Sequence, residues 1–186
     1  MRNPSILKLA AIALLAVGFA GAASAQICQN TCTAAISGPK QGVHTQFDTT
    51  ADAILWPPNH KLDTILITAE NQQGDPCNVT ITSTTQDEPV TGAGSGNTSP
   101  DAANCDNSCG TDANSACIDL RAERSGQLKD GRYYHVNFTM DDPDCPTTPA
   151  MDAAVVLVPH DQGNAHLLGW VDGPQTYPST TEACQP

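Results

Sequence analysis

Four stretches of the sequence alternate apolar and polar residues with a period of two, and this pattern constrains the fold more than any other feature. A period of two places every second side chain on the same face of a β-strand, and helical periodicity is nearly absent after the first 25 residues. Turn-forming residues separate the stretches. The pattern predicts an all-β protein with a single immunoglobulin-like antiparallel β-sandwich. The four stretches are Leu62–Thr68, Val79–Ser83, Tyr134–Met140 and Ala153–Val158.

The third stretch also predicts part of the hydrophobic core. Its apolar residues recur at every second position, so their side chains share one face of the strand, and the polar residues between them face solvent or another strand. The side chains expected in the core are those of Tyr134, Val136, Phe138 and Met140.

The first 25 residues have the pattern of a secretory signal peptide. A short apolar run follows Arg2 and Lys8, and small residues at Ala23 and Ala25 suit cleavage after position 25. The run is too short to span a bilayer, and a retained N-terminal anchor is the alternative interpretation. We expect a mature protein that begins at Gln26, is secreted or periplasmic in a bacterial envelope, and does not insert into the membrane.

The charge balance restricts the partners. Cleavage at that site leaves six basic and twenty acidic residues, a net charge of −14, which disfavours nucleic acid and anionic lipid. The remaining length suits one domain. We expect an N-terminal extension at 26–43, the sandwich at 44–172 and a C-terminal tail at 173–186. A polar, cysteine-bearing loop insertion is expected at about 91–117.

The chain has eight cysteines, all after the predicted cleavage site. An even number of cysteines in an exported chain predicts disulfide bonds. Zinc is the competing interpretation, but the two Cys-x-x-x-Cys pairs lack the two-residue spacing usual in zinc sites. The cysteines are Cys28, Cys32, Cys77, Cys105, Cys109, Cys117, Cys145 and Cys184.

Eight cysteines allow 105 pairings, so the connectivity stays open at the level of sequence. Cys77 and Cys145 each follow a strand and an Asp-rich turn, which predicts a bond between them at one end of the sandwich. A disulfide that ties the two ends of the chain together is also expected.

Five short motifs carry a resemblance to a known family. In their order along the chain they resemble a bacterial secreted immunoglobulin-like repeat of large surface proteins, related in pattern to hyalin-type and cadherin-like modules. The resemblance covers roughly Ile54–Gln162 and implies a β-sandwich used for adhesion or display, without catalytic residues. The chain departs from the pattern in its insertion at Asn104–Cys117 and in standing without tandem copies. The motifs are Leu55-Trp-Pro-Pro-Asn-His-Lys61, Asp87-Glu-Pro-Val90, Leu120-Arg-Ala-Glu-Arg-Ser-Gly126, Gly131-Arg-Tyr-Tyr134 and Val158-Pro-His-Asp-Gln162.

The cadherin-like part of the pattern implies a calcium site. Strand ends would gather carboxylates at one edge of the sandwich, and carboxylate oxygens are the ligands that Ca²⁺ prefers. The competing interpretation is that these are solvated carboxylates in turns of an acidic protein. Arg121 or Arg124 is expected to pair with a nearby carboxylate such as Glu88. The candidate calcium ligands are Glu88, Glu123, Asp141, Asp142 and Asp144.

Trp56 and His60 form a candidate platform for a ligand such as a sugar, although the indole can equally cover one end of the core. The usual catalytic motifs are absent from the sequence. The sequence therefore favours a non-catalytic binding or extracellular structural module that contacts a cell-surface or matrix component.

Two alternatives stay open. The first is a self-assembling filament or surface-layer subunit whose segment Gln26–Gly42 pairs with the sheet edge of a neighbour. The second is a small secreted hydrolase that uses His60 or His135 with a nearby carboxylate.

Overall fold

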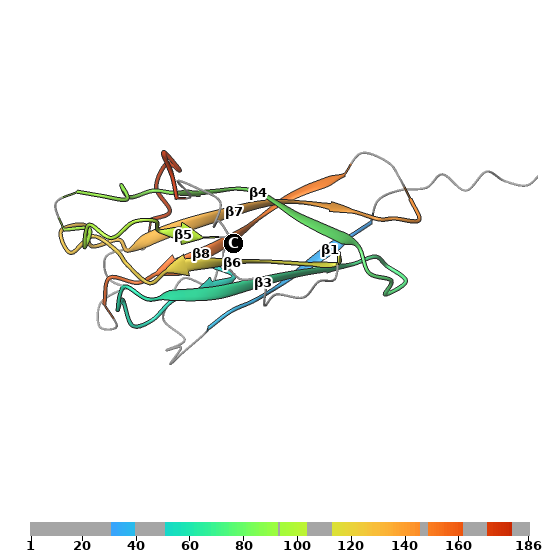
Figure 1. Ribbon diagram of the computed structural model, residues 1–186, viewed down its shortest axis with the longest axis horizontal. Helices are drawn as coiled ribbons and strands as arrows, with labels where there is room; N and C mark the ends of the chain where they lie inside the picture. The colour runs from blue at the N-terminus through green and yellow to red at the C-terminus, as the bar shows by residue number, and fades with distance from the viewer. Residues whose placement is uncertain are drawn as a thin grey trace, which may run out of the picture.

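The computed structural model describes residues 31–39, 51–92, 94–103, 113–145, 149–161 and 171–179. These residues form two β-sheets packed as a sandwich, which confirms the predicted fold class (Figure 1). One sheet has the strand order β1-β3-β6-β5 and the other β2-β8-β7-β4-β9. The strands are β1 (Thr33–Ser37), β2 (Ala53–Ile54), β3 (Leu62–Glu70), β4 (Asn78–Gln86), β5 (Ala102–Ala103), β6 (Ser115–Arg121), β7 (Arg132–Asp141), β8 (Ala150–Val158) and β9 (Tyr177–Pro178).

The order β1-β3-β6-β5 facing β8-β7-β4 is that of an immunoglobulin-like sandwich. The first two strands divide between the sheets, because β1 pairs antiparallel with β3 whereas β2 pairs parallel with β8. The sandwich is therefore antiparallel except at the short β2–β8 edge. The short β9, close to the end of the chain, lies beside β4 and extends the second sheet.

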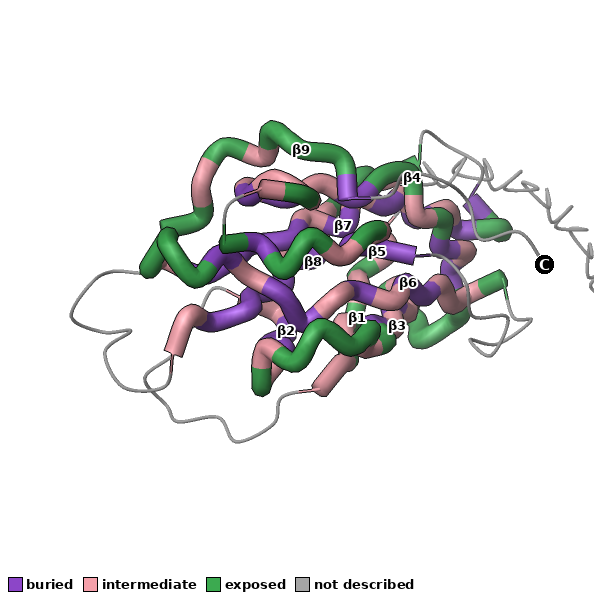
Figure 2. Tube along the Cα trace, turned by 60° about the vertical axis from the view of Figure 1, so that its left-hand side comes forward, coloured by how far each residue is buried: buried purple, intermediate pink, exposed green. Residues whose placement is uncertain are grey.

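The hydrophobic core lies between the two sheets. Tyr134, Val136, Phe138 and Met140 are all 3% exposed or less, as the alternation predicted. Ile65 and Ile67 of β3 meet them from the other sheet. Along β7 buried residues alternate with partly buried ones, and Figure 2 colours the chain by this burial.

The four predicted strands are present as β3, β4, β7 and β8. The sandwich also extends beyond the predicted 44–172, because β1 lies in the expected N-terminal extension and β9 in the expected C-terminal tail. The expected loop insertion contains β5 and the start of β6. Of the other five strands, β2, β5 and β9 are only two residues long, and β1 alternates mainly small side chains, which give a weak pattern. The fifth, β6, begins in the polar segment that was expected to be a loop.

The predicted bond between Cys77 and Cys145 is wrong, because Cys77 is bonded to Cys32 with a Cα–Cα distance of 6.2 Å. The Cys77 amide donates to the carbonyl oxygen of Ala69 in β3 (2.9 Å), which holds Cys77 on the side of the sandwich where β1 pairs with β3. Cys117 and Cys145 are also disulfide-bonded, and none of the described cysteines is free.

Several sequence predictions fall on parts of the chain outside the described residues. They concern the signal peptide at 1–25, the new N-terminus at Gln26, and the cysteines Cys28, Cys105, Cys109 and Cys184. Within the described ranges, no helix has the length and apolar character needed to cross a membrane.

Candidate functional site

The five motifs meet at one end of the sandwich, although they are spread over more than a hundred residues of sequence. We call this end the motif pole and define it by residues 55–61, 87–101, 121–132 and 158–161. Its loops include those drawn in light green and yellow at the left of Figure 1. Strands β4, β6 and β8 end here, and β3 and β7 begin here, so the topology alone brings the motifs together.

A buried ionic network centred on Arg132 lies beneath the motif pole. The guanidinium is fully buried, with Nε 3.0 Å from Glu88 Oε2 and Nη1 2.6 Å from Asp101 Oδ2. Gln86 donates through Nε2 to Asp101 Oδ2 and to the Glu88 carbonyl oxygen, both at 2.7 Å. Tyr134 accepts a bond from Arg132 and donates its hydroxyl to the Arg121 carbonyl oxygen at 2.9 Å. One guanidinium thus holds together β7, the loop after β4 and the loop before β5.

The network contains two buried carboxylates around one fully buried arginine, and a second arginine, Arg121, lies with Nε 3.9 Å from Asp101 Oδ1. Burial raises the pKa values of Glu88 and Asp101 above the usual range, and attraction to Arg132 only partly opposes this effect. Burial likewise raises the pKa of the Tyr134 hydroxyl, so this group stays protonated and can donate. The two carboxylates therefore take up protons more readily in the folded protein than in the unfolded chain.

Other side chains of the motifs bind the main chain of neighbouring loops. The Arg121 guanidinium donates to the carbonyl oxygens of Pro100 (2.9 and 2.8 Å) and His60 (2.7 Å). Arg124 donates to the carbonyl oxygen of His160 at 3.2 and 3.0 Å, and the Ser125 amide donates to Glu88 Oε2 at 2.6 Å. Charged groups of one motif therefore fix the loop that carries another.

His60, the last residue but one of the Leu55–Lys61 motif, is held in place by the consecutive residues Arg121, Ala122 and Glu123. The His60 amide donates to the Ala122 carbonyl oxygen (3.0 Å), and the imidazole Nδ1 lies 2.9 Å from Oε2 of the buried Glu123. The backbone of His60 has a φ of 62°, in the left-handed region that residues with a Cβ enter at a cost. The side chain nevertheless stays 52% exposed. The buried acid orients an imidazole that remains open to solvent.

The structure does not bring the five candidate calcium ligands together. Glu88 and Glu123 lie at the motif pole, whereas Asp141, Asp142 and Asp144 lie at the other end of β7. The ten residues of β7 separate the two groups, which corresponds to roughly 30 Å of extended chain. Arg132 is the partner of Glu88, whereas Arg121 pairs with another carboxylate, that of Asp101, with Nε 3.9 Å from Oδ1.

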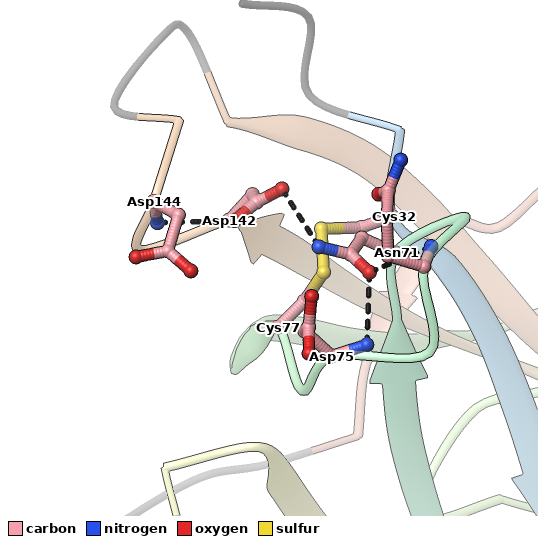
Figure 3. The surroundings of a disulfide bond; sticks show 7 residues. Cys32, Asn71, Asp75, Cys77, Asp142 and Asp144 are labelled. Carbon is pink, nitrogen blue, oxygen red and sulfur yellow. Dashed lines mark hydrogen bonds between the residues drawn. A yellow bond between two sulfur atoms is a disulfide. The ribbon is translucent and has the colours of Figure 1, made fainter.

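Two of the three aspartates, Asp142 and Asp144, lie near the Cys32–Cys77 disulfide (Figure 3). Asp142 Oδ2 accepts from Asn71 Nδ2 at 3.3 Å, and Asp142 Oδ1 accepts from the Asp144 amide at 3.0 Å. The described residues contain no group of three or more His, Cys, Asp or Glu side chains arranged to hold a metal ion. Calcium binding stays a prediction from the sequence.

The described lysines and arginines are unevenly distributed. All of them lie at the motif pole, and within the described ranges the charged residues at the opposite end are acidic. The basic residues are Lys61, Arg121, Arg124, Lys129 and Arg132.

The candidate ligand platform is partly exposed. Trp56 is half-buried, and its peptide bond to Pro57 is cis. The two histidines of the hydrolase hypothesis each have a carboxylate neighbour, Glu123 for His60 and Asp172 for His135, the latter with Nε2 2.6 Å from Oδ2. The geometry therefore meets the requirement for a nearby carboxylate, and the activity itself stays a prediction.

Sequence reasoning missed three residues of the network: Gln86, Asp101 and Arg132. A signal for Arg132 was present, because the inward-facing series Met140, Phe138, Val136 and Tyr134 reaches position 132 at the next step of two. An arginine at a core position requires buried partners.

No protein-family model, curated protein or solved structure matches the chain.

Proposed function

We propose that the protein is an exported, non-catalytic binding or extracellular structural module of a bacterial envelope. One observation carries the proposal. The charged side chains of the distinctive motifs bond to one another or to the main chain of neighbouring loops, around the buried Arg132. These residues build a rigid frame at one end of a sandwich.

A buried frame of this kind is better suited to hold binding loops in place than to catalyse a reaction. A catalytic site presents its reactive groups to a substrate, whereas Arg132, Glu88 and Asp101 are each 2% exposed or less. Loops fixed to a rigid scaffold are suited to present a surface to a partner. The resemblance to surface-protein repeats points in the same direction and suggests a cell-surface or matrix component as the partner.

The test is fractionation of a bacterium that expresses the full chain, followed by sedimentation of the purified mature protein with washed envelopes. We expect the mature protein outside the cytoplasm, and we expect the folded form to sediment with envelopes. Reduced and alkylated protein serves as the control, because it keeps the charge but loses the disulfide-bonded fold. Cytoplasmic retention, or equal sedimentation of both forms, would contradict the proposal.

The hydrolase alternative has its own readout. Turnover of an ester or glycoside by the purified protein that is abolished in His60→Ala, with an unchanged melting temperature, would favour a catalytic role for the exposed imidazole. We expect no such turnover.

A further inference from the structure

The edges of the two sheets differ in how they are protected against pairing with another chain. An exposed strand edge carries unpaired amide and carbonyl groups, and proteins guard it with short strands, charges, prolines or bulges. The edge strands β2, β5 and β9 are each only two residues long.

Strands β4 and β8, which lie beside two of these short edges, are guarded as well. The register of β4 is broken by a bulge between Ile81 and Ser83. On the outer edge of β4, the Val79 amide donates to the Ala113 carbonyl oxygen, and the Thr84 carbonyl oxygen accepts from the Ser179 amide. Strand β8 continues past β2, and there it carries the charged, exposed Asp152.

Strand β1 has none of these protections. It is five residues long, pairs with β3 in an unbroken register from Thr33 to Ser37, and contains no charge, proline or bulge. In the described part of the chain, no strand pairs with its other edge. The Cys32–Cys77 disulfide fixes the chain next to this strand, so the edge is held in an extended conformation before any partner arrives.

We propose that β1 pairs antiparallel with β1 of a second copy across a two-fold axis, which joins the two four-stranded sheets into one continuous sheet. The sequence Thr-Ala-Ala-Ile-Ser is nearly self-complementary in this arrangement. With Ala35 on the axis, Thr33 lies opposite Ser37 of the second copy, and Ala34 lies opposite its Ile36. The hydroxyl-bearing residues Thr33 and Ser37 are then cross-strand neighbours, and so are the apolar residues Ala34 and Ile36, which pack on the core of their own copy.

Charge selects this arrangement over a parallel one. The chain is strongly acidic, so two copies must approach where no carboxylates meet. Glu70 is the register partner of Thr33 at one end of β1. Antiparallel pairing places the Glu70 residues of the two copies at opposite ends of the joined strands, roughly 13 Å apart along the strand direction. Parallel pairing would bring them to the same end.

This inference does not rest on the proposed function, because a module that binds a foreign partner can be either a monomer or a dimer. It differs from the filament hypothesis, in which the segment Gln26–Gly42 adds to a neighbour. Here β1 stays in its own sheet, and its free edge forms a closed interface.

The test measures the molar mass of the mature, oxidised protein by light scattering and sedimentation equilibrium, from about 1 µM to about 200 µM. We expect the mass to double as the concentration rises. The position on the two-fold axis gives the decisive variants: in Ala35→Lys or Ala35→Glu, two like charges oppose each other about 5 Å apart. Each variant alone should dimerise at least tenfold more weakly than the wild type, and an equimolar mixture of the two should recover the dimer.

Thr80→Lys is the matched control, because Thr80 is exposed on β4 of the other sheet, and it should dimerise like the wild type. Ala35 is exposed, so thermal melting should show that both variants at position 35 stay folded. A wild type that is monomeric at every concentration would overturn the proposal. So would a dimer that Ala35→Lys leaves intact, or a mixture of the two charged variants that stays monomeric.

Discussion

Arg132 and Glu88 form an ion pair with an Nε–Oε2 distance of 3.0 Å, in which neither side chain is more than 2% exposed. The two residues are 44 positions apart, in two motifs that the fold brings to the same pole. Burial of a charge is costly unless a partner and hydrogen bonds compensate it. The frame at the motif pole therefore depends on every member of the network being present.

Replacement of Arg132 by Met should be strongly destabilising. The change leaves Glu88 and Asp101 buried without their shared cation, and the loss of one partner of a buried ion pair costs about 3–5 kcal/mol. Urea unfolding of the purified protein measures the effect. Arg124→Met is the matched control, because its guanidinium donates to the His160 carbonyl oxygen, and it should cost about 1 kcal/mol. Equal losses in the two variants would show that the network is not the stabilising element.

The stability of the protein should increase as the pH falls from 7 towards 5. Burial raises the pKa values of Glu88, Asp101 and Asp87, so the folded protein retains protons that the unfolded chain has already lost. The free energy of unfolding therefore decreases as the pH rises from the ordinary carboxyl pKa through the raised values. Urea midpoints measured at a series of pH values between 5 and 7 test this direction.

Repulsion among the many acidic groups acts in the same direction, so a variant is needed to separate the two causes. Asp87→Asn removes one of the three carboxyl groups whose pKa is raised, at nearly constant shape, and leaves the ion pairs of Arg132 intact. The dependence of the urea midpoint on pH should be flatter in this variant than in the wild type. A midpoint that falls steadily from pH 7 to pH 5 in the wild type would refute the assignment.

The fold could be predicted where large apolar side chains alternate with polar ones, as in β3 and β7. Strand β1 was not predicted because its only inward-facing apolar residues are Ala34 and Ile36, which alternate with small and hydroxyl-bearing residues. Both side chains are only partly buried. The two-residue strands form because longer neighbouring strands provide hydrogen-bonding partners. A segment of two residues is too short to show any periodicity in the sequence.

The site was harder to predict than the fold. The motifs were identified, but their side chains contact other motifs over 36 to 63 residues of sequence, and no local rule gives such partners. The calcium hypothesis failed to place its ligands together because it ignored strand direction. Glu88 lies beside the first residue of β7, whereas Asp142 and Asp144 follow its last.

Replacement of Gly96 by Ala should disrupt the contact between His60 and Glu123. A Cβ atom at position 96 would lie 2.5 Å from Cε1 of His60 and 3.1 Å from Cδ of Glu123. The imidazole must move, and we expect a cost of about 1–3 kcal/mol, typical of overpacking. Gly126→Ala is the control, because its nearest contact is an ordinary 3.5 Å to Arg124, and it should change stability by less than about 0.5 kcal/mol.

A double-mutant cycle separates this clash from a general effect of alanine at position 96. In the His60→Ala background the obstructing ring is gone, so Gly96→Ala should cost much less than in the wild type. Equal costs in both backgrounds would show that the close approach to His60 is unimportant for stability. Urea unfolding of the four proteins provides the comparison.

Removal of the Cys32–Cys77 disulfide should destabilise the protein and loosen one edge of the sandwich. The bond closes a loop with a sequence separation of 45, and the chain-entropy estimate for such a loop is about 4 kcal/mol. We expect this loss in the double variant Cys32→Ala with Cys77→Ala, measured by urea unfolding.

The loosening should be local as well as global, because Cys32 directly precedes β1, whereas β7 is central in the other sheet. Hydrogen exchange should therefore be faster in β1 of the double variant at a denaturant concentration where β7 is still protected. Disulfide mapping of the wild type under non-reducing conditions checks the premise, since a peptide that links Cys77 to Cys145 would restore the pairing predicted from sequence. In that case β1 would have no covalent anchor, and its exchange should not respond to the Cys32→Ala change.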